Sequence, residues 1–220
     1  MKPEVFAFRW VPPFAAGVVR DLRVRWALEE AGIAHEARLI GQEEKDGESY
    51  RALQPFGQVP AYREQGEHGA LELFESGAIV LHVAERSEAL LPRDPVGRAR
   101  AITWMFAALD TVEPPIQHLA SLDAFHAGEA WAKERKPGAT QAVEARIDVL
   151  ALRLEGRDHL EDRFTAGDLL MTTVLRILRS TDLVAARPAL DAYVRRCEAR
   201  PAFERALAAQ LAPFAENAPG

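Results

Sequence analysis

The chain of 220 residues contains a single cysteine, Cys197. One cysteine allows neither an internal disulfide nor a Cys-x-x-Cys redox pair, and such scarcity is typical of proteins from the reducing cytosol. No stretch reaches the roughly 18 uninterrupted apolar residues of a membrane-spanning helix. The start, MKPEVFAFRW, lacks the apolar core and small-residue cleavage site of a signal peptide. We therefore expect a cytoplasmic protein with no membrane partner.

Clusters of basic charge are also missing. The 33 acidic and 27 basic residues give a net charge of −6, and no run of Lys or Arg offers a surface for a phosphate backbone. We therefore expect no nucleic-acid partner. The six histidines form no pair on an expected helix face, so we expect no metal site. Apolar residues, in contrast, make up 48% of the chain, which is enough to bury the core of a globular protein.

The first ninety residues alternate between strand-like and helix-like patterns. EVFAFRW and AHEARLI read as strands, and RDLRVRWALEEAG, between them, has helical spacing and ends at a glycine. The next segment, GQEEKDGESYRAL, is polar and irregular, and it predicts at most a broken helix. PAYRE and ALELFE are short strands of a hairpin whose connection, QGEHG, permits a tight reversal, and a helix follows from Ser76. The predicted order is β-α-β-α-β-β-α.

Beyond this region the sequence has no strand-like alternation. The segment LLPRDPVGRAR, with two prolines, predicts a linker, and each apolar segment after it has helical spacing. Thr165 and Asp168 form an acidic variant of the helix capping box. Cys197 is expected to be a packing residue. We predict an α/β domain at 1–88, a linker at 89–96 and an all-helical domain at 97–220.

The stretch GQVPAY places Pro60 at the entrance of a strand. A cis X–Pro bond costs only about 1 kcal/mol relative to trans, so Val59-Pro60 could form a sharp corner there. The N–H and C=O of Val59 would then point outward and could bind an extended peptide as an added strand does. An isolated motif of this kind could equally be an ordinary trans-proline turn.

The stretch LFESGAI ends a strand at Glu75 and starts a helix at Ser76. The helix N-terminus suits the carboxylate of an amino acid, and Glu75 suits its ammonium group. Separately, Ser76 could be a simple N-cap and Glu75 a solvated strand end. Together with Val59 and Pro60, these residues could hold both the backbone and the free amino-acid end of a short peptide.

Over nearly its whole length the chain resembles the cytosolic glutathione transferase family, through GQVPAY, ELFESGAIVLHVAE, RVRWALEEAG, the capping box and RCEARPAFERAL. The resemblance implies a thioredoxin-like domain with a cis-proline, an all-helical domain and a homodimer. It also implies that Val59, directly before the cis residue Pro60, pairs through its main chain with the cysteinyl backbone of glutathione. Glu75 and Ser76 would bind the γ-glutamyl end, and Gln58 could reach the glycyl carboxylate.

One feature of that family is missing here. Its members commonly place a Ser, Tyr or Cys near the first helix to engage the glutathione sulfur, but this chain has no Ser, Thr, Tyr or Cys from Val5 through Glu48. Aligned through RVR, the usual serine falls near Val18. We therefore expect the main chain at Gly17 and Val18, at the mouth of the first helix, and the guanidinium of Arg20 to stabilise the thiolate. Arg20 could instead pair with a surface carboxylate.

An acceptor pocket is expected from apolar residues of both domains. Trp10, Pro12 and Phe14 could form a wall against Trp104 and Ala108, which are four residues apart on one helix face. The same residues could instead seal the contact between the domains.

The predicted function is a glutathione transferase that presents the thiolate of its co-substrate, glutathione, to a small hydrophobic electrophile. Glutathione-dependent reduction of disulfides or peroxides, or isomerisation, is an alternative. A non-catalytic protein-interaction module is another, because the usual hydroxyl is absent.

Overall fold

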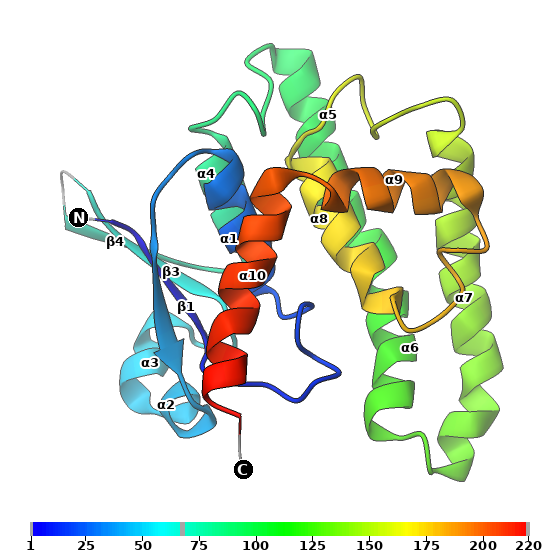
Figure 1. Cartoon of the computed structure of the whole chain (residues 1–220), viewed down its shortest axis with the longest axis horizontal. Coiled ribbons are helices and arrows are strands. Elements are labelled where there is room, and N and C mark those ends of the chain that lie inside the picture. The colour runs from blue at the N-terminus through cyan, green and yellow to red at the C-terminus, as the bar shows by residue number, and fades with distance from the viewer. Residues whose placement is uncertain (1, 67–68, 219–220) are drawn as a thin grey trace. The chain divides into compact units, whose positions relative to one another are not determined.

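The computed structural model describes residues 2–66 and 69–218. These residues form two compact units, one of residues 2–66, 69–90 and 201–218 and one of residues 91–200. The first unit contains, in chain order, β1 (Glu4–Phe8), α1 (Asp21–Glu30), β2 (Glu36–Ile40), α2 (Gln42–Asp46), α3 (Glu48–Leu53), β3 (Ala61–Gly66), β4 (Gly69–Phe74), α4 (Ser76–Ala84) and α10 (Pro201–Glu216) (Figure 1). The predicted order β-α-β-α-β-β-α is confirmed, with the broken helix present as α2 and α3. Residues 67–68 of the expected hairpin turn lie outside the described residues.

The strands described in this unit form one sheet in the order β2-β1-β3-β4. β1 and β2 are parallel, whereas β3 is antiparallel to both β1 and β4. Successive side chains of β1 face opposite sides of the sheet. Phe6 packs with Tyr50 and Leu53 of α3, while the neighbouring Val5 and Ala7 are also fully buried. The sheet therefore carries an apolar layer on each face.

Helix α1 is the central helix of the first unit. It packs against β1, α4 and α10, and its residues from Asp21 through Leu28 are all buried. Trp26 of α1 meets Phe203 of α10 edge to face, with 4.8 Å between ring centroids. This packing explains why residues from Pro201 onward belong to the first unit, although we expected them in the helical domain.

The second unit is helical throughout its described residues. It consists of α5 (Pro95–Phe106), the π-helical segment η1 (Ala107–Val112), α6 (Glu113–Phe125), α7 (Ala130–Leu154), α8 (Ala166–Leu175), the 3-10 segment η2 (Arg176–Leu178) and α9 (Pro188–Glu198). The π-helical segment η1 joins α5 to α6, which begins with Glu113, Pro114 and Pro115. Glu113 N–H donates to Ala108 O, five residues back, and the two prolines after it have no N–H to donate.

None of the described helices is long and apolar enough to cross a membrane.

Candidate functional site

The Val59–Pro60 peptide bond is cis and lies directly before β3. Both residues are buried. Among the residues that the structure describes, no partner hydrogen-bonds to the main-chain N–H or C=O of Val59. These two groups are therefore available to pair with an extended peptide.

Two side chains hold the loop that leads to this corner. The buried phenol of Tyr50 donates to the main-chain oxygen of Gln58, with 2.6 Å between the oxygens. The Gln54 side-chain oxygen accepts from Phe56 N–H at 2.7 Å. Burial raises the pKa of Tyr50, so this phenol stays a donor throughout the physiological range. The side chain of Gln58 itself is exposed, but its main chain is held in place.

Glu75 has an unusual backbone conformation, with φ 68° and ψ 113°. Among the described residues other than glycine, it alone has a positive φ. Such a conformation costs about 1–3 kcal/mol, and residues that keep it cluster at functional sites. The Glu75 side chain is exposed, whereas Ser76, the first residue of α4, is 4% exposed.

The hairpin register brings the two predicted motifs together. Ala61 at the start of β3 pairs with Phe74 at the end of β4. Pro60 and Glu75 are the next residues along the two strands, so the cis corner and the start of α4 lie side by side. A carboxylate, a helix N-terminus and two unpaired main-chain groups thus converge at one end of the hairpin.

The structure adds a residue that the sequence analysis missed. Arg23 of α1 is 2% exposed, and its Nη1 donates to Ser76 Oγ at 3.2 Å. Hydrophobic periodicity gives no signal for it, because α1 buries charged and apolar residues alike from Asp21 through Leu28.

The start of α1 differs from our expectation. The helix begins at Asp21 after a series of turns, and the N–H of Val18 already donates to Ala15 O at 3.1 Å. Val18 therefore cannot offer its N–H to a thiolate, and Gly17, with φ 78°, lies in a turn rather than at a helix mouth. Arg20 is the N-cap residue and is partly exposed.

A buried polar network occupies the first turn of α1. Asp21 Oδ2 accepts from Arg25 Nε at 2.7 Å, so the predicted i,i+4 pair is present. Gln210 of α10 donates to Asp21 Oδ1 at 2.6 Å and to Val19 O at 3.1 Å. Burial raises the pKa of Asp21, against the opposing effect of the Arg25 charge. An ionised Asp21 would oppose a thiolate near this helix end, which weakens the helix-dipole hypothesis.

The residues expected in the acceptor pocket fall in both units. In the first unit, Trp10 is partly exposed, and Pro12 and Phe14 are exposed. In the second, Ala108 is buried, and Trp104 Nε1 donates to Glu161 Oε1 at 2.8 Å. Trp104 thus takes part in the packing of the helical unit.

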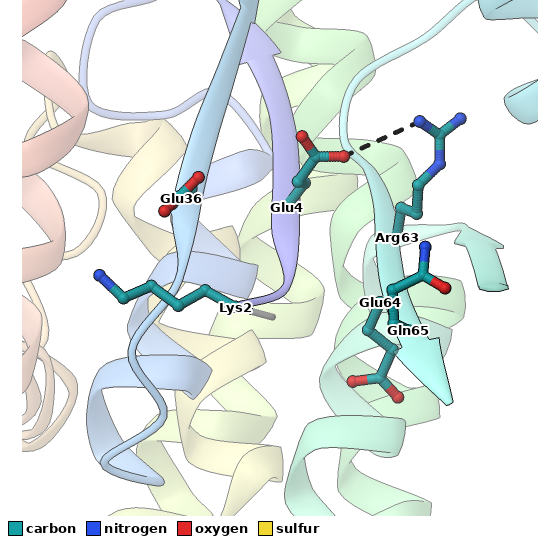
Figure 2. Close-up of a pocket in the computed structure, with 6 residues that line it drawn as sticks. All are labelled: Lys2, Glu4, Glu36, Arg63, Glu64 and Gln65. Atoms are coloured by element: carbon teal, nitrogen blue, oxygen red, sulfur yellow. Dashed lines mark ion pairs between the residues drawn. The ribbon is translucent and has the colours of Figure 1, made fainter. Parts of the chain in front are cut away.

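A charged pocket of about 340 Å³ lies elsewhere on the first unit. Figure 2 shows its lining residues, with the Arg63 guanidinium directed toward Glu4 and 3.8 Å between the paired atoms. Glu64, another lining residue, accepts hydrogen bonds from Tyr62 at 2.7 Å and from Arg86. The hydrogen bonds from Arg86 are the main reason why the pKa of Glu64 is lowered to about 2. The lining includes none of the predicted glutathione-binding residues.

Two other kinds of reactive site were considered, the thiol of Cys197 and a cluster of metal-ligating side chains. Cys197 is fully buried on α9, and burial raises the pKa of its thiol to about 12, as expected of a packing residue rather than a nucleophile. Within the described residues, no group of three or more His, Cys, Asp or Glu is placed to hold a metal ion.

The fold and the hairpin site define a thioredoxin-like domain with a cis-proline corner, accompanied by a helical domain. Residues 22–92 match the family of the glutathione S-transferase N-terminal domain. A glutathione S-transferase of Hyoscyamus muticus is 30% identical over 208 residues, which cover 84% of this chain and 92% of that protein. The chain therefore belongs to the glutathione S-transferase family, which confirms the resemblance seen in the sequence.

Two further proteins are similar to this chain. A glutathione transferase from Burkholderia graminis, solved with two glutathione molecules bound per subunit, is 26% identical with a TM-score of 0.82, covering 94% of this chain and 88% of that one. The disulfide-bond oxidoreductase YghU of Escherichia coli strain K12 is 30% identical over 82 residues, which cover 36% of this chain and 28% of that protein.

Proposed function

We propose that this protein binds glutathione at the end of the β3–β4 hairpin and presents its thiolate to a small hydrophobic electrophile. The observation that carries the proposal is the placement of the cis Val59–Pro60 corner beside Glu75 and Ser76. The unpaired main-chain groups of Val59 suit the cysteinyl backbone. Glu75 suits the γ-glutamyl ammonium, and the start of α4 with Ser76 suits the adjacent carboxylate. Gln58 is the candidate for the glycyl carboxylate.

Activation of the sulfur is assigned to Arg20 rather than to a hydroxyl. The chain has no Ser, Thr, Tyr or Cys between Val5 and Glu48, and the Val18 N–H is used internally. A guanidinium at the N-cap of α1 could supply positive charge to a bound thiolate. Titration of bound thiolate absorbance tests this role. An Arg20→Ala variant should raise the apparent thiol pKa, and an unchanged pKa would dismiss Arg20.

The acceptor site is proposed to include Trp10, Pro12 and Phe14 of the first unit. The exposure of Pro12 and Phe14 supports their part in it. We further propose a cytoplasmic homodimer. The family resemblance supports the dimer, and the single buried cysteine suits a reducing compartment. Sedimentation equilibrium tests the dimer, and a monomer at micromolar concentration would contradict it.

Calorimetry with glutathione tests the binding proposal. The variant Glu75→Gln should weaken binding by about tenfold or more, as expected when a charged hydrogen bond is lost. Glu72→Gln is a matched control, because Glu72 is an exposed carboxylate on β4, near Glu75, and pairs with Arg63 at 2.8 Å. The control should bind like the wild type. Absence of wild-type binding at millimolar glutathione would favour the non-catalytic interaction module.

Glutathione-dependent disulfide reduction is a second candidate, favoured by the similarity to YghU. In that reaction the glutathione thiolate attacks a disulfide sulfur, forms a mixed disulfide and releases a thiolate. A second glutathione then resolves the mixed disulfide, yielding glutathione disulfide. Parallel assays with 1-chloro-2,4-dinitrobenzene and with hydroxyethyl disulfide separate the two chemistries. Turnover of the disulfide alone would replace conjugation as the proposed reaction.

A further inference from the structure

The buried contact between Arg23 and Ser76 joins α1 to the first residue of α4. These residues are 53 positions apart in sequence, and their side chains are 3.2 Å apart at the hydrogen-bonded atoms. Arg23 is 2% exposed and Ser76 is 4% exposed. A guanidinium removed from water in this way is costly unless it is hydrogen-bonded, and the bond to Ser76 meets part of that need.

The direction of this hydrogen bond sets the chemistry of Ser76. A guanidinium has only donors, whereas a hydroxyl has one donor and two acceptor lone pairs. Because Arg23 donates to Ser76 Oγ, the hydroxyl proton must point elsewhere, and it is available to a ligand acceptor. Polarisation by the positive charge also makes the hydroxyl a stronger donor.

The charges around the start of α4 also favour the binding of a carboxylate. The N-terminus of α4 already favours an anion through its N–H groups and helix dipole. The guanidinium of Arg23 brings N–H donors and a positive charge to the same helix end. The exposed carboxylate of Glu75, beside this terminus, suits an ammonium rather than a second anion.

We propose that Arg23 is a positioning residue that makes Ser76 a hydrogen-bond donor for a carboxylate adjacent to an ammonium group. This inference rests on the proposed glutathione function and assigns Arg23 to the α-carboxylate of the γ-glutamyl residue. Arg23 acts through Ser76 and through its charge, without touching the reacting sulfur.

Calorimetry with two peptides tests the assignment. One peptide is glutathione, and the other is 4-aminobutanoyl-cysteinyl-glycine, which has the same amine but lacks the α-carboxylate. Arg23→Gln should weaken glutathione binding by about tenfold, the loss expected for a charge-assisted contact, and leave the analogue unchanged. Equal weakening of both peptides would indicate a purely structural role and overturn the proposal. Arg38→Gln, which removes an exposed charge on β2, should change neither affinity.

A double-mutant cycle provides a second measurement. Ser76→Ala should weaken glutathione binding more when Arg23 is present than when it is replaced, because the two side chains act together. Additive losses would overturn the proposal. If Arg23→Gln does not fold, Arg23→Met can carry the same cycle, because it also removes the donors and the charge. Wild-type protein that fails to bind glutathione would refute the proposed function itself, whereas normal binding by Arg23→Gln would refute only the role of Arg23.

Discussion

Gln210 of α10 donates a 2.6 Å hydrogen bond to Asp21, the first residue of α1, across 189 positions of sequence. Both side chains are 1% exposed, and Arg25, which pairs with Asp21 from the next turn, is 2% exposed. The last helix of the chain therefore holds the start of the first helix through a buried polar network. This network belongs to the same unit as the candidate glutathione site.

Loss of the Asp21 carboxylate should strongly destabilise the protein. Asp21→Ala leaves the buried Arg25 guanidinium without its carboxylate, which costs about 3–5 kcal/mol in such cases. The matched control is Arg205→Ala, because Arg205 of α10 pairs with Glu29 of α1 at 2.7 Å with most of its side chain exposed. That change should cost less than about 1 kcal/mol. Urea unfolding measures both, and similar losses would show that the buried network contributes little.

Replacement of Glu75 by glycine should relieve backbone strain, increase stability and weaken glutathione binding. Glycine adopts a positive φ freely, so Glu75→Gly removes strain of about 1–3 kcal/mol, against at most about 1 kcal/mol of added chain entropy. Glu75→Ala lacks the same carboxylate but keeps the strain. Thermal unfolding should place the glycine variant above the alanine variant, while calorimetry shows weakened glutathione binding in both. A glycine variant less stable than the alanine variant would contradict this explanation.

The capping box of α8 should be a major stabilising feature of the helical unit. Asp168 accepts hydrogen bonds from Leu160 N–H at 2.9 Å, Thr165 N–H at 2.9 Å and Tyr193 OH at 3.1 Å. Asp168→Ala leaves these buried donors unpaired at about 1–3 kcal/mol each, so we expect a loss above about 3 kcal/mol. The exposed N-cap Asp94, which accepts from Gly97 N–H, provides the control. Asp94→Ala should cost about 1 kcal/mol in urea unfolding. Equal losses would contradict the prediction.

Glu64 should make stability depend on acid pH. Its pKa in the folded protein is about 2, below the ordinary value of 4.5, chiefly because Arg86 hydrogen-bonds the carboxylate. Between these values the unfolded chain takes up a proton that the folded protein does not, so the contribution to stability is lost as the pH falls from about 4.5 toward 2. Glu64→Gln should flatten this part of the curve of unfolding free energy against pH. An unchanged slope would show that the ion pair is fully screened.

The candidate glutathione site was largely predictable because its signals are local. Pro60 at a strand entrance and Glu75-Ser76 at a strand-to-helix junction each mark a backbone geometry that short sequence patterns specify. The short helices around Gly47 and the capping box at Thr165 were predictable for the same reason. The loop before α1 was less predictable, because turn hydrogen bonds among residues 12–18 delay the start of the helix to Asp21.

The sequence by itself determined the order of strands and helices, the cis-proline motif, the junction at Glu75 and the absence of a hydroxyl before Ser49. These features depend on residue type and spacing within one or two turns of chain. Only the tertiary structure placed Arg23 beneath Ser76, joined Gln210 to Asp21 and moved the last helix into the first unit. Such contacts join residues 53 to 189 positions apart, and they depend on how helices pack rather than on any local pattern.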